Sequence, residues 1–101
     1  MNKRLKEKWV KALMSGKYEQ NHDGSLYHGG AYCCLGVLRS INDPYDTSRS
    51  DNGDLSNDSE YLTDAHLRKF GLTRRIQSEL ADINDEGIPF PVIAGFIQEN
   101  L

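Results

Sequence analysis

The sequence contains no long hydrophobic run. No stretch approaches the roughly 18 apolar residues that a membrane-spanning helix needs. The first residues, Met1 to Arg4, lead into a charged segment rather than into the apolar core of a signal peptide. We therefore expect a protein that neither enters a membrane nor is exported, and that works in the cytoplasm of the cell that makes it.

Cysteine is also scarce, since the chain has only Cys33 and Cys34. Neighbouring cysteines can bridge only through a strained ring that lies outside ordinary disulfide geometry. We expect two buried thiols in a reducing compartment. A zinc site is not expected, because adjacent cysteines chelate tetrahedral zinc poorly and only His22 and His28 lie close to them in the sequence. No metal and no cofactor is predicted.

Charge is unevenly distributed along the chain. The formal net charge of -3 at pH 7 argues against a protein whose whole surface binds phosphate. Residues 1–17 nevertheless hold six Lys or Arg residues against Glu7, and residues 43–60 hold six acidic residues against Arg49. The basic segment is either the solvated face of a helix, compensated within the protein, or a surface for nucleic acid or an acidic partner. Residues 43–60 predict a mobile acidic loop with a turn at Asn52-Gly53.

Hydrophobic spacing predicts two helices in the first half of the chain. Leu5, Trp9 and Leu13 follow at steps of four, and the apolar positions between Cys34 and Ile41 follow the helical rule. Gly36 interrupts this second helix, which indicates a close approach by another helix or by a ligand.

Capping residues mark three further helices in the second half of the chain. Thr63 and Thr73 are typical N-caps, the first of a short helix that Gly71 closes. The second of these helices ends near Gly87, and Pro91 suits the first turn of a last helix.

Residues 17–32 predict one β-hairpin with a turn at Asp23-Gly24, followed by a hinge at His28-Gly29-Gly30. The chain is thus expected to be α+β and mostly α, with four to five short helices, one β-hairpin near residues 17–32 and a mobile acidic loop near 43–60. At 101 residues it is expected to form a single domain, 1–101.

Several polar or aromatic residues flank the helices without an evident packing role: Tyr18, Gln20, Tyr32, Asn84 and Asp85. They serve either as caps and turn bonds or as the lining of a ligand pocket. In a pocket, the two tyrosines would stack on a base and the two amides would bind its polar edges. Arg74 or Arg75, beside a helix N-terminus, would bind phosphate.

Three blocks of the sequence are distinctive. They are Lys8-Trp9-Val10 with Ser15-Gly16-Lys17-Tyr18-Glu19-Gln20, then Cys33-Cys34-Leu35-Gly36-Val37-Leu38, and Leu80-Ala81 with Ile83-Asn84-Asp85. On these blocks the chain resembles a group of small uncharacterised proteins of bacteriophage and prophage genomes. The resemblance implies a protein made inside an infected bacterial cell. Such proteins often have a further cysteine where this chain has Arg39-Ser40, and this difference weakens any metal or redox interpretation.

The resulting hypothesis is a phage-encoded, non-enzymatic binding protein that interferes with a host process, above all with bacterial defence. It would sequester a small nucleotide-like signal or bind a host protein. A homodimer through the last helix stays open, and nucleic acid is not the expected partner. No catalytic residue is assigned.

One alternative is a small cysteine hydrolase with Cys33 as nucleophile, because a helix dipole at the first turn would lower its thiol pKa. The other is a DNA- or RNA-binding regulator that uses the basic first helix.

Overall fold

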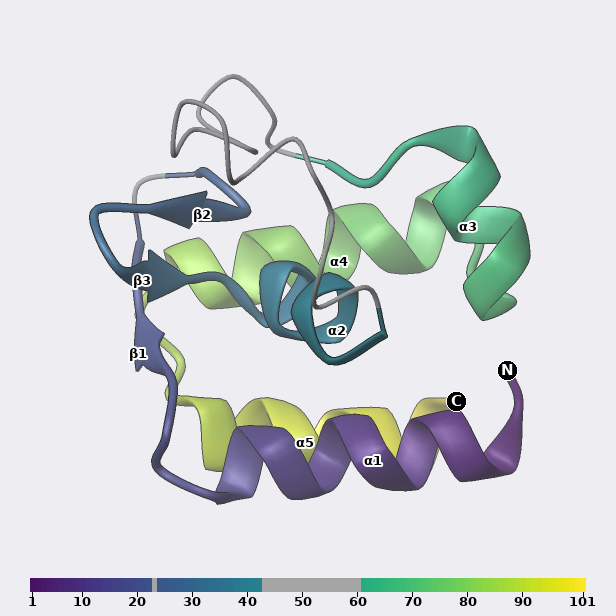
Figure 1. The fold of residues 1–101 in the computed structure, drawn as a ribbon, viewed down its shortest axis with the longest axis horizontal. Coiled ribbons are helices and arrows are strands. Elements are labelled where there is room, and N and C mark those ends of the chain that lie inside the picture. Colours follow the sequence, from purple (N-terminus) through teal and green to yellow (C-terminus); the bar gives the residue numbers. More distant parts are fainter. Residues whose placement is uncertain (23, 43–60) are drawn as a thin grey trace.

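The computed structural model describes residues 1–22, 24–42 and 61–101, which form five helices and a small three-stranded sheet (Figure 1). The helices are α1 (Lys3–Met14), α2 (Cys34–Asn42), α3 (Asp64–Phe70), α4 (Arg74–Asp85) and α5 (Phe90–Asn100). The strands are β1 (Glu19–Gln20), β2 (Tyr27–His28) and β3 (Ala31–Tyr32). The predicted class, α+β and mostly α, is confirmed. The acidic loop predicted at 43–60 lies outside the described residues. Within the described ranges, no helix is long and apolar enough to cross a membrane.

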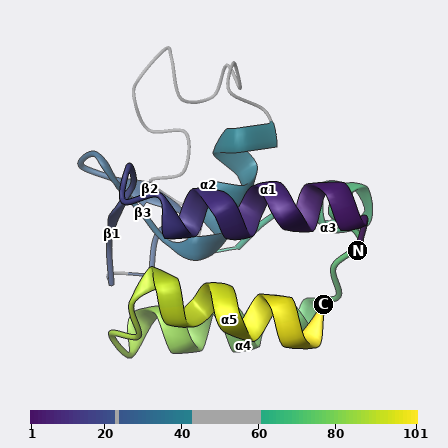
Figure 2. The same cartoon turned by 90° about the horizontal axis from the view of Figure 1, so that it is seen from below.

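Four helices enclose the core. Helix α1 packs along α5, α2 contacts both α1 and α4, and α4 contacts α5 (Figure 2). Helix α1 begins where the side-chain oxygen of Asn2 accepts hydrogen bonds from the backbone N–H groups of Arg4 and Leu5, at 2.8 and 3.2 Å. Its buried residues are Trp9 and Leu13, as the four-residue spacing predicts.

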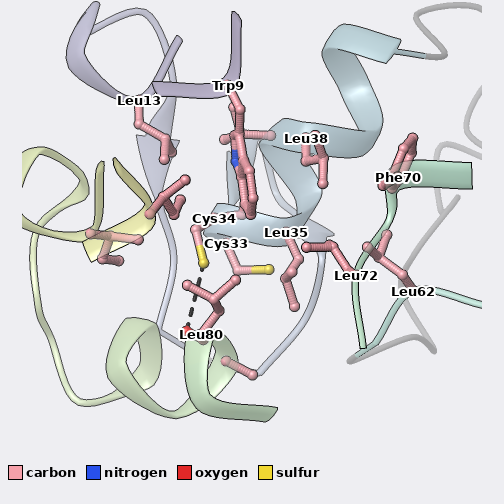
Figure 3. Packing of buried hydrophobic residues seen from close by; sticks show 14 of the residues in the cluster. Trp9, Leu13, Cys33, Cys34, Leu35, Leu38, Leu62, Phe70, Leu72 and Leu80 are labelled. Atoms are coloured by element: carbon pink, nitrogen blue, oxygen red, sulfur yellow. Dashed lines mark hydrogen bonds between the residues drawn. The ribbon is translucent and has the colours of Figure 1, made fainter. Parts of the chain in front are cut away.

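Trp9 lies at the centre of this core (Figure 3). Its side chain is fully buried, and its indole N–H donates a hydrogen bond of 2.9 Å to the backbone carbonyl of Cys34. A buried indole N–H needs an acceptor, so this bond sets the orientation of the ring. Trp9 therefore joins α1 to the first turn of α2 by packing and by one directional bond.

The sheet has the order β1-β3-β2, which differs in part from the prediction. A hairpin does lie within residues 17–32, but β2 pairs with β3, and β1 runs parallel to β3. Asp23, half of the turn predicted at Asp23-Gly24, lies outside the described residues, and the hinge predicted at His28-Gly29-Gly30 was wrong. Gly29 and Gly30, with φ of 59° and 88°, form the tight turn of the hairpin. Two consecutive residues with positive φ are what a two-residue hairpin turn requires, and a Gly-Gly pair adopts them without strain.

The caps predicted for the second half of the chain are confirmed. Thr63 and Thr73 accept hydrogen bonds from backbone N–H groups three residues later, both at 3.1 Å. Gly71 and Gly87 follow α3 and α4 with positive φ, and Pro91 lies in the first turn of α5. These local signals therefore determine where α3, α4 and α5 begin and end along the chain.

Gly36 is a point of close approach, as predicted, but its neighbour is neither a helix nor a ligand. A Cβ atom at Gly36 would overlap the carbonyl oxygen of Leu26, in the segment that leads into β2. The same carbonyl accepts a hydrogen bond of 3.1 Å from the backbone N–H of Cys33. The start of α2 therefore lies directly against the backbone before β2, where only glycine fits.

Replacing Gly36 by alanine is expected to lower the free energy of unfolding by about 1–3 kcal/mol, because the new methyl group meets a backbone atom that cannot rotate away. Gly95→Ala is the matched control, since a Cβ at this helical glycine of α5 has no neighbour within 4 Å. It should leave stability unchanged or raise it by up to about 1 kcal/mol. Urea denaturation of the two variants measures the difference. Equal stabilities would contradict the close approach.

Candidate functional site

The side chain of Asn84 is the centre of a buried hydrogen-bond network. Its oxygen accepts from the side-chain amide of Gln20 at 2.9 Å and from the backbone N–H of Cys34 at 3.2 Å. Its amide nitrogen donates to the backbone carbonyl of Asn21 at 2.8 Å and to a carboxylate oxygen of Asp85 at 3.2 Å. A primary amide has two acceptor and two donor positions, and all four are used here. Asn84 is fully buried.

Two further bonds tie the end of β1 and the residues after it to the end of α4 and the turn that follows. Gln20 also donates to the backbone carbonyl of Ile88 at 2.7 Å, and Nδ1 of His22 lies 2.8 Å from the backbone carbonyl of Asn84. The structure thus brings the predicted residues Gln20, Asn84 and Asp85 together. Gln20 and Asp85 both form hydrogen bonds with the side chain of Asn84. The fully buried Asn84 therefore has no bonding position left for a ligand.

The two predicted tyrosines also meet. The rings of Tyr18 and Tyr32 pack edge to face with their centres 5.2 Å apart. Sequence reasoning missed Tyr27, whose ring lies 4.8 Å from that of Tyr32 across the hairpin. A turn assigned to Gly29-Gly30 would have predicted this contact from the sequence, because Tyr27 and Tyr32 are then cross-strand partners. All three side chains are half-buried.

The two predicted phosphate-binding arginines lie elsewhere. Arg74 and Arg75 begin α4, about 15 Å along the helix from Asn84 and Asp85 by its rise per residue. Arg74 binds both carboxylate oxygens of Asp64, at 3.2 and 2.8 Å, and this exposed pair lowers the pKa of the Asp64 carboxyl. Arg75 lies 3.6 Å from Glu79. The arginines therefore do not face the Asn84 network.

The two cysteines are buried and protonated. Sγ of Cys33 accepts a bond of 3.4 Å from the backbone N–H of Gly36, and Sγ of Cys34 donates to the carbonyl of Leu80 at 3.6 Å (Figure 3). Burial raises the pKa of Cys33 to about 11 and that of Cys34 well above its usual value. The expected lowering by the helix terminus was wrong, because the cost of burying a thiolate outweighs the bonds at the start of α2. Neither thiol is an activated nucleophile.

Metal-binding chemistry finds no support in the described ranges, where no three His, Cys, Asp or Glu side chains gather as ligands would.

The outer face of α1 is the strongest concentration of charge in the described chain. Arg4, Lys8 and Lys11 are exposed on it, opposite the face that buries Trp9. The ion pairs between described residues are Arg74 with Asp64 and Arg75 with Glu79, and none involves a basic residue of α1.

This face borders three surface hollows that share Lys8. The largest, about 540 Å³, has Val10 and Met14 as its apolar part and is surrounded by basic side chains of α1. A second, about 380 Å³, is bordered by Lys8, Lys11, Lys17 and Tyr18. The third, about 280 Å³, lies toward the N-terminal end of α1 and includes Lys69 of α3. We call Arg4, Lys6, Lys8, Val10, Lys11 and Met14 the basic face; Arg4, Lys8, Lys11 and Met14 are exposed, whereas Lys6 and Val10 are half-buried.

Residues 1–70 match the model of a family described as Domain of unknown function (DUF8296). Because the match covers more than half of the chain, the protein belongs to this family. The matched part includes α1, the sheet, α2 and α3 and ends before α4 and α5. No curated protein and no solved structure matches the chain.

Removing the Asn84 amide is expected to destabilise the protein strongly. Asn84→Ala leaves the backbone N–H of Cys34 and the carbonyl of Asn21 buried without their partner, each at a cost of about 1–3 kcal/mol. Asn100→Ala is the matched control, since Asn100 is exposed and makes one local bond to Phe96 in its own helix. Thermal unfolding should show a large loss for the first variant and a small one for the second. Similar losses would show that the network is not central.

Alkaline pH is expected to destabilise the fold through the thiols. The folded-state pKa of Cys33, about 11, lies above its ordinary value of 9.0. The folded state therefore holds the proton more tightly, so this contribution to stability is complete below about pH 9 and is lost as pH rises toward 11. Urea denaturation across this range should give a flatter pH dependence for Cys33→Ala than for the wild type. Parallel curves for the two proteins would contradict the assignment.

Proposed function

We propose that the protein is a non-enzymatic binding protein that engages an acidic host protein through the basic face of α1. The observation that carries this proposal is that Arg4, Lys8 and Lys11 are exposed on α1 and form no ion pair with another described residue, while the opposite face of the helix buries Trp9 and Leu13. The resemblance to phage and prophage proteins supplies the context, in which the host is an infected bacterium, the site of action is its cytoplasm and the process is host defence.

The composition of the basic face favours a protein partner over nucleic acid. Val10 and Met14 form an apolar centre, and 58% of Met14 is exposed. Met is enriched in protein interfaces, and an apolar centre within a polar, solvent-accessible rim is their usual plan. Binding to duplex through phosphates would use only the lysines and arginines and would leave this centre without a role. Glu7 also lines the hollow, and its negative charge would repel a phosphate backbone.

A nucleotide-like signal is a second candidate, and one specific hollow favours it. Lys8, Lys11 and Lys17 border the same 380 Å³ hollow as Tyr18. Lysines bind phosphate and a tyrosine ring can stack on a base. In this nucleotide-binding candidate, Tyr18 has the role predicted from the sequence. The phosphate-binding role predicted for the two arginines of α4 falls instead to lysines of α1 and of the segment after it.

Reversing charges on α1 is expected to abolish capture of the host partner. The variant Lys8→Glu with Lys11→Glu alters two exposed side chains and should fold normally, because neither contributes to the core. The matched control is Arg74→Glu with Arg75→Glu, which makes the same charge change on exposed residues of α4. Proteins that the wild type captures from bacterial lysate are identified and purified. Calorimetric titration then measures their affinity for the wild type, the α1 variant and the α4 variant.

The proposal expects a loss of affinity of about 100-fold or more for the α1 variant, since two charged contacts are replaced by like-charge repulsion, and little change for the α4 variant. Retention of the partner by the α1 variant would contradict it. Binding that depends on α1 but occurs only with duplex DNA, RNA or nucleotides would replace it by one of the alternatives.

A further inference from the structure

The apolar centre of the basic face has a spacing that suits contact with a second helix. Val10 and Met14 lie four residues apart on α1, and the charged Glu7 precedes them by three residues, which are the intervals at which a helix presents one row to a partner helix. Arg4 and Lys11 lie beside this row on one side and Lys6 on the other. These are the positions whose charges select the partner in a coiled coil.

We propose that this groove binds an amphipathic α-helix of the partner protein, with apolar residues at its centre and carboxylates along both edges. The inference rests on the proposed function and names the element that α1 recognises. An amphipathic helix lying in a groove is a common mode of recognition in which anchors repeat every three to four residues. Its apolar side chains would contact Val10 and Met14, and its acidic edges would lie against Arg4, Lys6 and Lys11.

Charge repulsion opposes α1 of a second copy of this chain as the occupant. Pairing α1 with α1 would place lysines and arginines on both edges of the row, where like charges repel. Glu7 adds a point of specificity, because a basic residue opposite it would complete the pairing at that end of the row. Lys8 and Gln98 of α5 complete the lining of the groove, and the neutral amide of Gln98 can bond to either a donor or an acceptor.

The test uses the full chain and two synthetic helical peptides of three heptads. Both have leucine at the central positions; one has glutamate at the edge positions and the other has lysine. Fluorescence anisotropy measures binding of each labelled peptide. We expect the glutamate peptide to bind, with an affinity that falls as salt is raised, and the lysine peptide not to bind.

Two variants locate the site. Met14→Gln replaces an exposed apolar side chain of α1 by a polar one of similar length, and Val92→Gln places the same polar residue at an equally exposed apolar position of α5; both native residues are 58% exposed. The first should weaken binding of the glutamate peptide by about tenfold or more, as truncation of an apolar anchor does, and the second should leave it unchanged. Circular dichroism confirms that both variants remain folded.

Equal binding of the two peptides, or equal effects of the two variants, would overturn the inference, as would the absence of any binding by the glutamate peptide. Failure here is distinguishable from failure of the proposed function. If the charge reversal on α1 still abolishes capture of the host partner while the glutamate peptide does not bind, the basic face is the docking surface and its occupant is not a helix of this kind.

Discussion

The fold depends on burying one asparagine amide with every bonding position satisfied. Asn84 lies in α4, and its partners come from the end of β1, the residue after it and the first residue of α2. A buried amide is unfavourable when any of these bonds is missing, so the network is stable only when all three segments are in place together. Trp9 completes the arrangement from the other side, because its indole N–H binds the carbonyl of the same Cys34 whose N–H binds Asn84.

This constraint explains why the interior offers so little for chemistry. Asn84 is saturated, and the two thiols are held neutral by burial, which raises their pKa values. The polar groups that stand out in the sequence as a potential pocket are therefore used to hold the fold. Under the proposed function, recognition takes place at the surface, where α1 presents the basic side chains of the first segment.

Helix α1 has two separate tasks on its two faces. One face carries Trp9 and Leu13 into the core and packs on α5 and α2. The other presents basic side chains around Val10 and Met14. The inner face anchors the helix, so under the proposed function the outer face would be preformed and would avoid the entropic cost of ordering on binding. Membership in a family defined over residues 1–70 includes this helix with its scaffold.

The sequence by itself determined what is local: the helices, because periodic apolar residues and caps such as Thr63, Thr73 and Gly71 act within a few residues of themselves, and the uneven charge that makes one face of α1 basic. Only the tertiary structure decided the partners of Gln20 and Asn84, which are 64 residues apart, the parallel pairing of β1 with β3, and the contact between Gly36 and Leu26. It also separated Arg74 and Arg75 from the site in which they were expected. Spacing along a chain says which side chains share a face, but long-range bonds are selected by burial, which a single sequence does not display.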